Sequence, residues 1–265
     1  GMTHELPLPF DVKLTNLATS LLVAALVLGG VLLALWWGVR NPAFAIRQIT
    51  VDGDTARNDA TSLGSSVLPR LTGNFFTLDL AATQLAFQSA PWVRRAMVQR
   101  EFPNKLHVTL QEHVPVAHWG DGAERLVNIQ GELFEVPGGD AEGGDKPTLL
   151  GPDGESAQVL AMYKQLSPVV APLGTEVAGL ALLSRGDWRM ELEQGAVIEL
   201  GRGTPRQLTA RLAQFVATVK EVAARHQRPV EAVEAADLRH SGGYALRLRG
   251  VSTVRLDPQA KPGPR

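Results

Sequence analysis

The feature that most constrains this chain is an apolar run of 23 residues, Leu17 to Val39, without a charged side chain. As an α-helix rising about 1.5 Å per residue, it would be roughly 34 Å long, enough to cross a hydrocarbon core about 30 Å thick. Trp36 and Trp37 lie at its end, where such rings prefer the lipid–water interface. Arg40 and the Asn41-Pro42 step follow, and the proline is expected to end the helix. The run therefore predicts one transmembrane helix over residues 17–39, preceded by a tail over residues 1–16.

Two other origins of this apolar run are a helix buried in a soluble domain and a cleaved signal peptide. A buried soluble helix normally keeps a polar stripe, and this run has none. Ala43-Phe44-Ala45 resembles a signal-peptidase site, but the run is longer than the apolar core of about 7–15 residues found in signal peptides. An uncleaved anchor is therefore favoured. The charges on its two sides nearly balance, so the positive-inside rule does not orient it.

Composition and motifs argue against several functional classes. The 26 basic and 27 acidic residues nearly cancel, whereas nucleic-acid-binding proteins usually carry a basic excess. The absence of cysteine excludes disulfides, thiol nucleophiles and zinc–cysteine clusters. None of the six histidines belongs to an H-E-x-x-H motif, no G-x-S-x-G elbow is present, and Gly201-Arg202-Gly203 lacks the spacing of a nucleotide-binding loop. We therefore expect a non-enzymatic protein with no catalytic residue, metal, cofactor or nucleic-acid partner.

Residues 44–119 predict a small α+β domain in the order strand, helix, helix, strand, strand. The expected strands are residues 45–51, 96–101 and 106–110, and the expected helices run from Asn58 or Asp59 to Leu68 and over residues 80–89. Asp79 is a suitable cap for the second helix. Leu106, Val108 and Leu110 alternate with polar residues, so they should form the buried face of a strand.

Residues 120–257 predict a second domain of many strands with two helices. The expected strands are residues 126–129, 133–136, 177–183, 188–193, 196–200, 233–239, 244–248 and 252–256, and the expected helices are residues 156–166 and 205–226. Gln130-Gly131 is typical of a hairpin turn. Thr204 and Pro205 supply an N-cap and a first-turn proline for the longer helix. Residues 258–265 are expected to be a disordered tail.

Six short segments follow one another behind the predicted anchor. They are Ile49–Gly53, Pro91–Val93, Arg100–Leu106, Glu112–Trp119, Leu200–Gly203 and Asp237–Arg239. In this order and spacing they resemble the FtsQ/DivIB family of bacterial cell-division proteins. The resemblance covers nearly everything after residue 15.

The resemblance implies a POTRA domain over residues 44–119 and the family's β domain over residues 120–257. It implies a single-pass protein of the inner membrane at the division septum, with a cytoplasmic N-terminus and a periplasmic body. Its function would be that of a non-enzymatic divisome scaffold that binds FtsB and FtsL and helps control septal peptidoglycan synthesis. Other division proteins would bind through the POTRA domain, and membrane lipid would surround the anchor.

In the family, FtsB adds a strand to the last strands of the β domain. The resemblance therefore assigns the partner site to Arg185, Arg239, His240, Ser241, Gly242, Gly243, Tyr244, Ala245 and Leu246. Arg239 ends the Asp-Leu-Arg motif, Arg185 precedes Gly186-Asp187-Trp188, and His240 stands where enterobacterial members carry tyrosine.

Physical chemistry supports such a site independently. Tyr244, Leu246 and Leu248 alternate with Ala245 and Arg247, so one row can pack inward while the other meets solvent. An unpaired strand edge can accept a strand from a partner, and arginines can bind its carboxylates.

Three alternatives stay open on the residues alone. The segment would be an ordinary C-terminal strand if its arginines served only solubility. A POTRA-containing protein of an envelope export or assembly system would need a downstream β-barrel, and an anchored periplasmic enzyme would need a cluster of catalytic groups. Neither is visible in the sequence.

Overall fold

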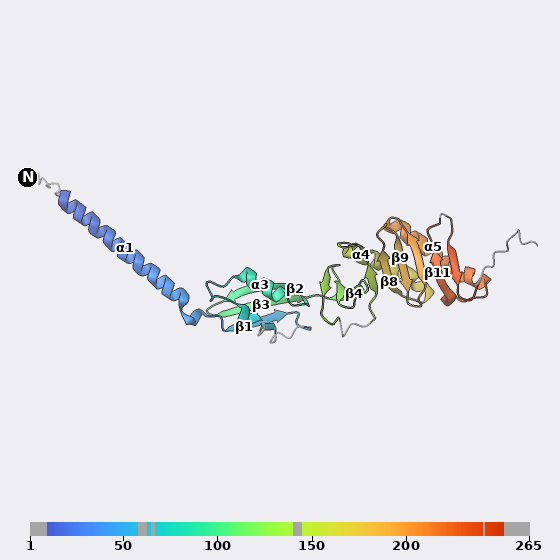
Figure 1. Cartoon of the computed structure of the whole chain (residues 1–265), viewed down its shortest axis with the longest axis horizontal. Coiled ribbons are helices and arrows are strands. Elements are labelled where there is room, and N and C mark those ends of the chain that lie inside the picture. The colour runs from blue at the N-terminus through green and yellow to red at the C-terminus, as the bar shows by residue number, and fades with distance from the viewer. Residues whose placement is uncertain (1–9, 58–62, 65–66, 140–144, 241, 252–265) are drawn as a thin grey trace, which may run out of the picture. The chain divides into compact units, whose positions relative to one another are not determined.

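The computed structural model describes residues 10–57, 63–64, 67–139, 145–240 and 242–251 (Figure 1). The chain divides into two compact units, Gly1–Glu112 and His113–Arg265. A long helix and a small sheet belong to the first unit, and a larger sheet belongs to the second. Each unit has its own hydrophobic core.

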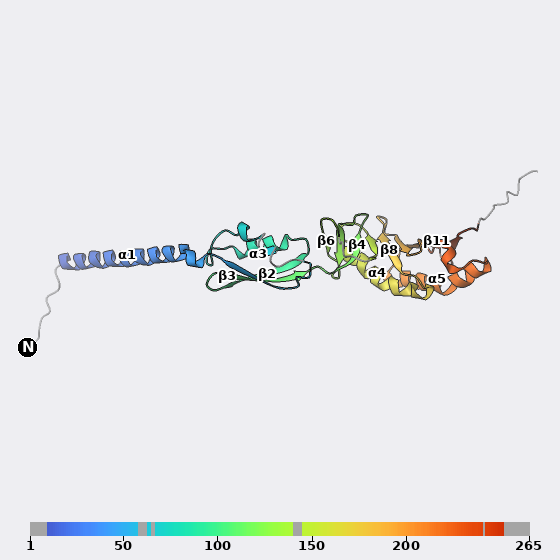
Figure 2. The same cartoon turned by 90° about the horizontal axis from the view of Figure 1, so that it is seen from below.

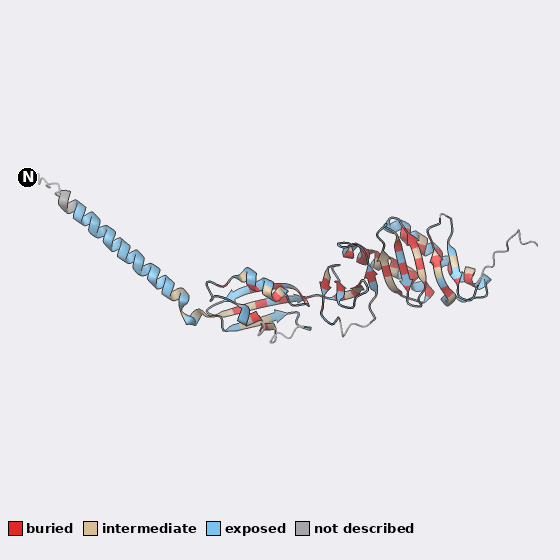
Figure 3. Cartoon of the chain, viewed as in Figure 1, coloured by how far each residue is buried: buried red, intermediate tan, exposed pale blue. Residues whose placement is uncertain are grey.

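The long helix α1 (Phe10–Arg40) presents apolar side chains on every side. None of its residues from Leu14 onward is buried in the protein (Figure 3). The helix contains the predicted span of residues 17–39 and continues the same helical path at both ends. A surface of this kind suits hydrocarbon on all sides, as a membrane span requires.

The first unit is a sheet with a helix packed on it. Its elements are η1 (Pro42–Phe44), β1 (Gln48–Gly53), η2 (Leu68–Arg70), α3 (Leu80–Gln88), β2 (Val93–Glu101) and β3 (Lys105–Glu112). Among the described residues the strand order is β1-β3-β2, with β1 parallel and β2 antiparallel to β3. Leu106, Val108 and Leu110 are buried with Phe87 of α3, as their alternation predicts. Asp79 caps α3 by accepting two backbone N–H bonds from its first turn.

The second unit is a mixed sheet covered on one face by two helices. Its strands are β4 (Pro115–Trp119), β5 (Arg125–Asn128), β6 (Leu133–Glu135), β7 (Thr148–Leu150), β8 (Val177–Leu182), β9 (Trp188–Leu192), β10 (Val197–Gly201), β11 (Val233–Asp237) and β12 (Ala245–Leu248). In the described part of the chain their order is β12-β11-β10-β9-β8-β7-β4-β5-β6. The helices α4 (Ser156–Val170) and α5 (Pro205–Arg225) lie side by side on one face (Figure 2).

The helix α5 carries the chain from β10 to β11, which run parallel. Thr204 starts it with a reciprocal cap, because its hydroxyl accepts the Gln207 N–H while the Gln207 side chain accepts the Thr204 N–H. One row of α5 side chains is buried against the sheet: Leu208, Leu212, Phe215, Val219 and Ala223. Short 3-10 turns, η3 (Ala171–Leu173) and η4 (Val230–Ala232), follow α4 and α5.

Some predicted boundaries differ from the structure. The first domain was expected to extend to Trp119, but β4 pairs with β5 and β7, so this strand belongs to the second unit. The helix expected to end at Leu166 continues to Val170, because Pro168 removes only one N–H donor in its last turn and Val170 is buried.

Other predictions fall partly or wholly outside the described residues. Residues 58–62 of the expected first POTRA helix lie outside the described residues. Further along the same expected helix, Leu63, Gly64 and Val67 are described and are helical. The strand expected over residues 252–256 and the tail over residues 258–265 also lie outside the described residues.

Candidate partner-binding edge

The strand β12 lies at one end of the larger sheet. It pairs antiparallel with β11, Ala245 opposite Asp237 and Leu248 opposite Val233. Within the part of the chain that the structure describes, no strand pairs with its other side. An end strand of this kind presents unpaired N–H and C=O groups to another polypeptide.

The backbone of β12 indicates which groups face outward. Just past the strand, the Arg249 N–H donates to the Ala232 C=O at 2.7 Å, toward β11. A register shift in β11 lies between Val233 and Ala235, so the rest of β12 is oriented from the far end of β11. The Leu238 N–H donates to the Glu199 C=O, toward β10, so Asp237 and Ala235 face β12 and their partners Ala245 and Arg247 face β11. The N–H and C=O of Leu246, between them, are therefore directed to the open side.

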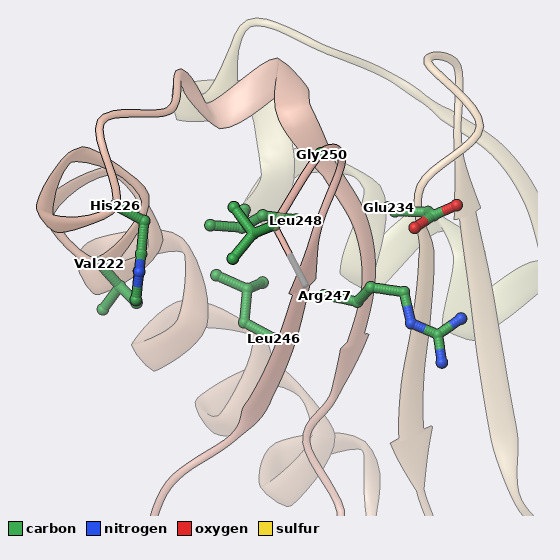
Figure 4. Close-up of a pocket in the computed structure, with 8 residues that line it drawn as sticks. Val222, His226, Glu234, Leu246, Arg247, Leu248 and Gly250 are labelled. Carbon is green, nitrogen blue, oxygen red and sulfur yellow. The ribbon is translucent and has the colours of Figure 1, made fainter. Parts of the chain in front are cut away.

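The side chains of this segment occupy two faces, as their alternation predicts. Leu248 is buried and Leu246 half-buried, whereas Ala245 and Arg247 are exposed. In Figure 4, Leu246 and Leu248 point toward α5, and Arg247 lies on the other side of the strand. The strand is thus held to the helix by one face, which leaves its edge free.

Tyr244 fixes the start of β12 to the middle of α5. Its hydroxyl lies 2.9 Å from Thr218 Oγ1, and its ring meets Phe215 edge-on at 5.1 Å between centroids. Aromatic pairs favour this perpendicular arrangement. The segment before the edge is therefore positioned by a hydrogen bond and a ring contact.

A hollow of about 770 Å³ follows the open side of β12 (Figure 4). Its lining comes from both faces of the sheet: Val222, His226, Glu234, Leu246, Arg247, Leu248, Gly250 and Val251. Val222, Leu246 and Leu248 line it with apolar side chains, and Glu234 and Arg247 line it with charged groups.

A smaller hollow of about 150 Å³ lies at the other end of the strand, between α5 and the loop that leads into β12. The loop residues His240, Gly242 and Gly243 line it. Gly242 has a φ of +96°, a conformation that glycine adopts without strain. Ser241, which was also assigned to the site, lies outside the described residues.

Arg239 and Asp237 form an ion pair where β11 ends. The Arg239 guanidinium donates to both carboxylate oxygens, and its backbone N–H donates to Oδ1 at 3.0 Å. The side-chain hydrogen bond from Arg239 is the main reason that the pKa of Asp237 is lowered to about 2. Partial burial of the carboxylate opposes this shift, and the backbone hydrogen bond from Arg239 adds to it. The same bond raises the pKa of Arg239 above its usual range.

Gly201 makes room for this arginine. Its φ is +74°, and a Cβ built on it would lie 2.8 Å from Arg239 Cγ. A larger residue would therefore displace the Arg239 side chain from the end of β10. The Gly201-Arg202-Gly203 segment thus positions the arginine as well as leading into α5.

Arg185 lies in the tight turn between β8 and β9. The turn is closed by a Leu183 N–H bond to the Asp187 C=O at 2.8 Å, and the Asp187 carboxylate pairs with Arg202 at 3.5 Å. Asp187 and Glu199 also contribute to the raised pKa of Arg239. Arg185 is exposed and forms no ion pair with any residue in the described ranges. The structure thus brings Arg185, Arg202 and Arg239 to one end of the sheet.

His240 is less engaged than its neighbours. Its side chain is 68% exposed, and its Nε2 lies 3.9 Å from Asp237 Oδ2. The wall of the hollow formed by Val222 and His226 was not assigned from the sequence. Local sequence patterns could not identify these residues, because they come close to β12 only when α5 packs on the sheet.

The histidine at position 113 is held by packing. Its ring stacks on Phe134 at 4.1 Å, and its Nδ1 lies 2.9 Å from Asn128 Nδ2. Among the residues described, no group of three or more His, Asp or Glu side chains could hold a metal ion. The open edge of β12 with its arginines is therefore the candidate binding site within the described ranges.

Two family models match this chain. The model described as "Cell division protein FtsQ/DivIB, C-terminal" matches residues 117–239, and the model described as "POTRA domain, FtsQ-type" matches residues 44–113. Both matches end before β12 begins. The assignment of the open edge therefore depends on geometry rather than on the matched segment.

Curated relatives match over most of the chain. A protein of Burkholderia pseudomallei named "Cell division protein FtsQ" is 38% identical over 91% of this chain and 94% of its own length. A protein with the same name from Thiomonas arsenitoxydans is 36% identical over 97% of this chain and 94% of its own length. Another from Neisseria meningitidis is 30% identical over 84% of this chain and 91% of its own length. With α1, these relatives indicate a single-pass protein anchored in a membrane.

Proposed function

The chain belongs to the FtsQ/DivIB family of cell-division proteins, and from that premise we propose that it is a non-enzymatic divisome scaffold that binds FtsB and FtsL. The N-terminal tail over residues 1–16 lies in the cytoplasm, and the POTRA domain and the β domain lie in the periplasm. The anchor crosses the inner membrane at the division septum. The POTRA domain contacts other division proteins, and the assembled complex helps control septal peptidoglycan synthesis.

FtsB binds by adding a strand to β12. The single observation that carries this proposal is that no other described strand pairs with the outer side of β12, where the hollow lies. Strand addition gains main-chain hydrogen bonds, and side-chain pockets then supply specificity. The outward N–H and C=O of Leu246 provide the first pair of such bonds, and the apolar lining of Val222, Leu246 and Leu248 receives apolar side chains of the added strand.

The arginines at the sheet end give the partner its charge preference. Arg185 and Arg239 are exposed, and a guanidinium can bind a carboxylate through two parallel hydrogen bonds. A strand that carries acidic residues beside its pairing segment therefore suits this end of the sheet. His240, Gly242 and Gly243 line the smaller hollow that the incoming chain passes.

The direct test is co-purification of the full membrane-anchored chain with FtsB and FtsL after co-expression and detergent extraction. The expected result is a stable three-protein complex. A complementary measurement is disulfide cross-linking from a cysteine at position 246 to single cysteines along FtsB, since the chain has no cysteine of its own. Cross-links confined to another surface of this chain would contradict strand addition at β12.

A further inference from the structure

Four phenylalanine rings gather at one end of the first unit, and we call them the phenylalanine patch. They are Phe44 just after α1, Phe75 and Phe76 in the loop before α3, and Phe102 in the β2–β3 turn. Phe44 meets Phe76 at 5.0 Å, and Phe75 meets Phe102 at 5.6 Å between ring centroids. Phe76 is 50% exposed and Phe102 is 69% exposed. A cluster of outward aromatic rings marks a surface that something covers.

The phenylalanine patch is attached to the end of α1. Phe44 follows Val39 by five residues, and the Asn74 side-chain amide donates to the Val39 C=O. The Phe75 N–H donates to the Phe44 C=O at 2.8 Å. Through these bonds the loop that carries Phe75 and Phe76 is held beside the last turn of the anchor. The patch therefore lies at the level where the anchor leaves the bilayer.

Tryptophans and cations complete the same zone. Trp36 and Trp37 are exposed in the last turns of α1, and the Arg40 guanidinium lies 4.5 Å from the Trp36 ring. Arg47 is also exposed, and its N–H donates to the Asn104 C=O at 3.0 Å, beside the turn that carries Phe102. Aromatic rings with nearby arginines are typical of the lipid headgroup region, where the rings enter the bilayer and the cations meet phosphates.

Glu101 and Asp79 are the acidic residues closest in the chain to the rings of the patch. Glu101 precedes Phe102 and pairs in register with Lys105 across the turn. Asp79 is occupied in capping α3. The charges that flank the rings and the anchor end, Arg40 and Arg47, are therefore basic. This arrangement favours the phosphate-bearing surface of a bilayer as the partner.

We propose that the phenylalanine patch inserts into the headgroup region of the bilayer that α1 crosses, as a second attachment of the POTRA domain to the membrane. The inference uses the membrane anchor but not the strand-addition site. The continuity of the patch with the end of α1 identifies lipid as the occupant. The attachment restrains the domain at the surface instead of leaving it on a flexible tether.

The test uses single cysteines in the full chain, which has none of its own. Phe76→Cys and Phe102→Cys proteins are labelled with bimane and reconstituted into nanodiscs of phosphatidylethanolamine and phosphatidylglycerol. The lipids carry a spin label near the headgroup. Gln111→Cys is the matched control, since β3 places it about 20 Å from Lys105 at the far end of the strand. Circular dichroism verifies that each labelled protein is folded.

The expected result is quenching by the spin-labelled lipid at positions 76 and 102 that exceeds quenching at position 111 by at least about twofold. Iodide in the aqueous phase should quench in the reverse order. Adding Phe76→Ser to the Phe102→Cys protein should reduce the lipid quenching. Equal quenching at all three positions would overturn the proposal. Protection of positions 76 and 102 from both quenchers would also overturn it, because it would identify protein, such as a second copy, as the cover.

Discussion

Arg239 and Asp237 are joined by two side-chain hydrogen bonds, from Nε to Oδ1 at 2.8 Å and from Nη2 to Oδ2 at 2.6 Å. Charge-assisted pairs with this two-point geometry are stronger than single hydrogen bonds. A guanidinium has five N–H donors, and in the described structure Asp237 takes two of them. The pair therefore orients Arg239 at the end of the sheet and leaves donors for a partner carboxylate.

Reversing the charge at this position should abolish binding of FtsB. In Arg239→Glu the new carboxylate would lie beside Asp237, so an acidic partner would meet two negative charges instead of a balanced pair. We expect at least a tenfold loss of FtsB in co-purification, which corresponds to about 1.4 kcal/mol. The measurement is the FtsB band in pull-downs of the full chain from solubilised membranes.

Arg125→Glu is the matched control for that variant. Arg125 is also an exposed arginine in an ion pair, with Glu135 at 3.7 Å, but it lies on β5 near the opposite end of the sheet. Each variant breaks an exposed ion pair and places two carboxylates side by side, so both should lower the melting temperature modestly and by similar amounts. If both variants retained FtsB equally, Arg239 would not be part of the FtsB-binding site.

A proline at position 246 should block strand addition. Proline lacks the N–H that Leu246 directs to the open side, and β11 does not use that donor. Leu246→Ala keeps the donor and shortens the side chain, so it separates the lost hydrogen bond from the lost packing. We expect FtsB to bind Leu246→Ala and not Leu246→Pro, as measured by co-purification.

Ala245→Pro supplies the opposite comparison for the same strand. Its N–H is inferred to bond β11, so this substitution should lower the melting temperature of the second unit more than Leu246→Pro does. Thermal unfolding followed by circular dichroism would detect the difference. Lower stability of Leu246→Pro than of Ala245→Pro would show that the assigned direction of the β12 backbone is wrong.

Removing the Tyr244 hydroxyl should weaken the fold. Tyr244→Phe keeps the ring contact with Phe215 and removes the hydrogen bond to Thr218, whose hydroxyl still donates to the Gln214 C=O at 2.9 Å. We expect a loss of about 0.5–1.5 kcal/mol in the free energy of unfolding. Urea denaturation measures it, and a Thr218→Ala double-mutant cycle isolates the pair. If Tyr244→Phe lowered the free energy of unfolding by the same amount in the Thr218→Ala background, the effect would come from a contact other than the Tyr244–Thr218 hydrogen bond.

The Arg239–Asp237 pair should make stability depend on pH at the acidic end. Because the folded pKa of Asp237 is about 2 and lies below the ordinary value of 3.8, this carboxylate stabilises the fold above about pH 4. That contribution falls as the pH drops from about 4 to about 2. NMR titration of the Asp237 side-chain carboxyl should show a midpoint near 2 in the parent.

Arg239→Gln should raise that midpoint toward the ordinary value, since the first cause of the lowered pKa is then removed. Spectra at each pH would show whether the unit is still folded. An unchanged midpoint in Arg239→Gln would mean that another group stabilises the charged carboxylate.

Local patterns in the sequence predicted most elements of the fold. The apolar run before Arg40, the alternation in Leu106–Leu110 and the Thr204-Pro205 helix start each depend on residues close together in the chain. The boundary at Trp119 could not be found in this way, because the local patterns gave no strand over Pro115–Trp119. Its membership is decided by pairing with β5 and β7.

The candidate site was only partly predictable for the same reason. Alternation in Tyr244–Leu248 predicts a half-buried strand, and the family resemblance selected Arg185 and Arg239. Neither pattern indicates that β12 ends the sheet, because strand order is set by pairings between distant segments. The wall of Val222 and His226 likewise depends on how α5 packs.

The crossover through α5 also sets an order of events during synthesis. Because β11 pairs parallel to β10, it can join the sheet only after the intervening helix has emerged and packed. β12 follows β11 and pairs with nothing else among the described residues, so it is among the last parts of the sheet to form. If FtsB pairs with β12 as proposed, an incomplete chain, or one arrested before this step, would offer it no docking strand, and recruitment would be restricted to molecules that have finished folding.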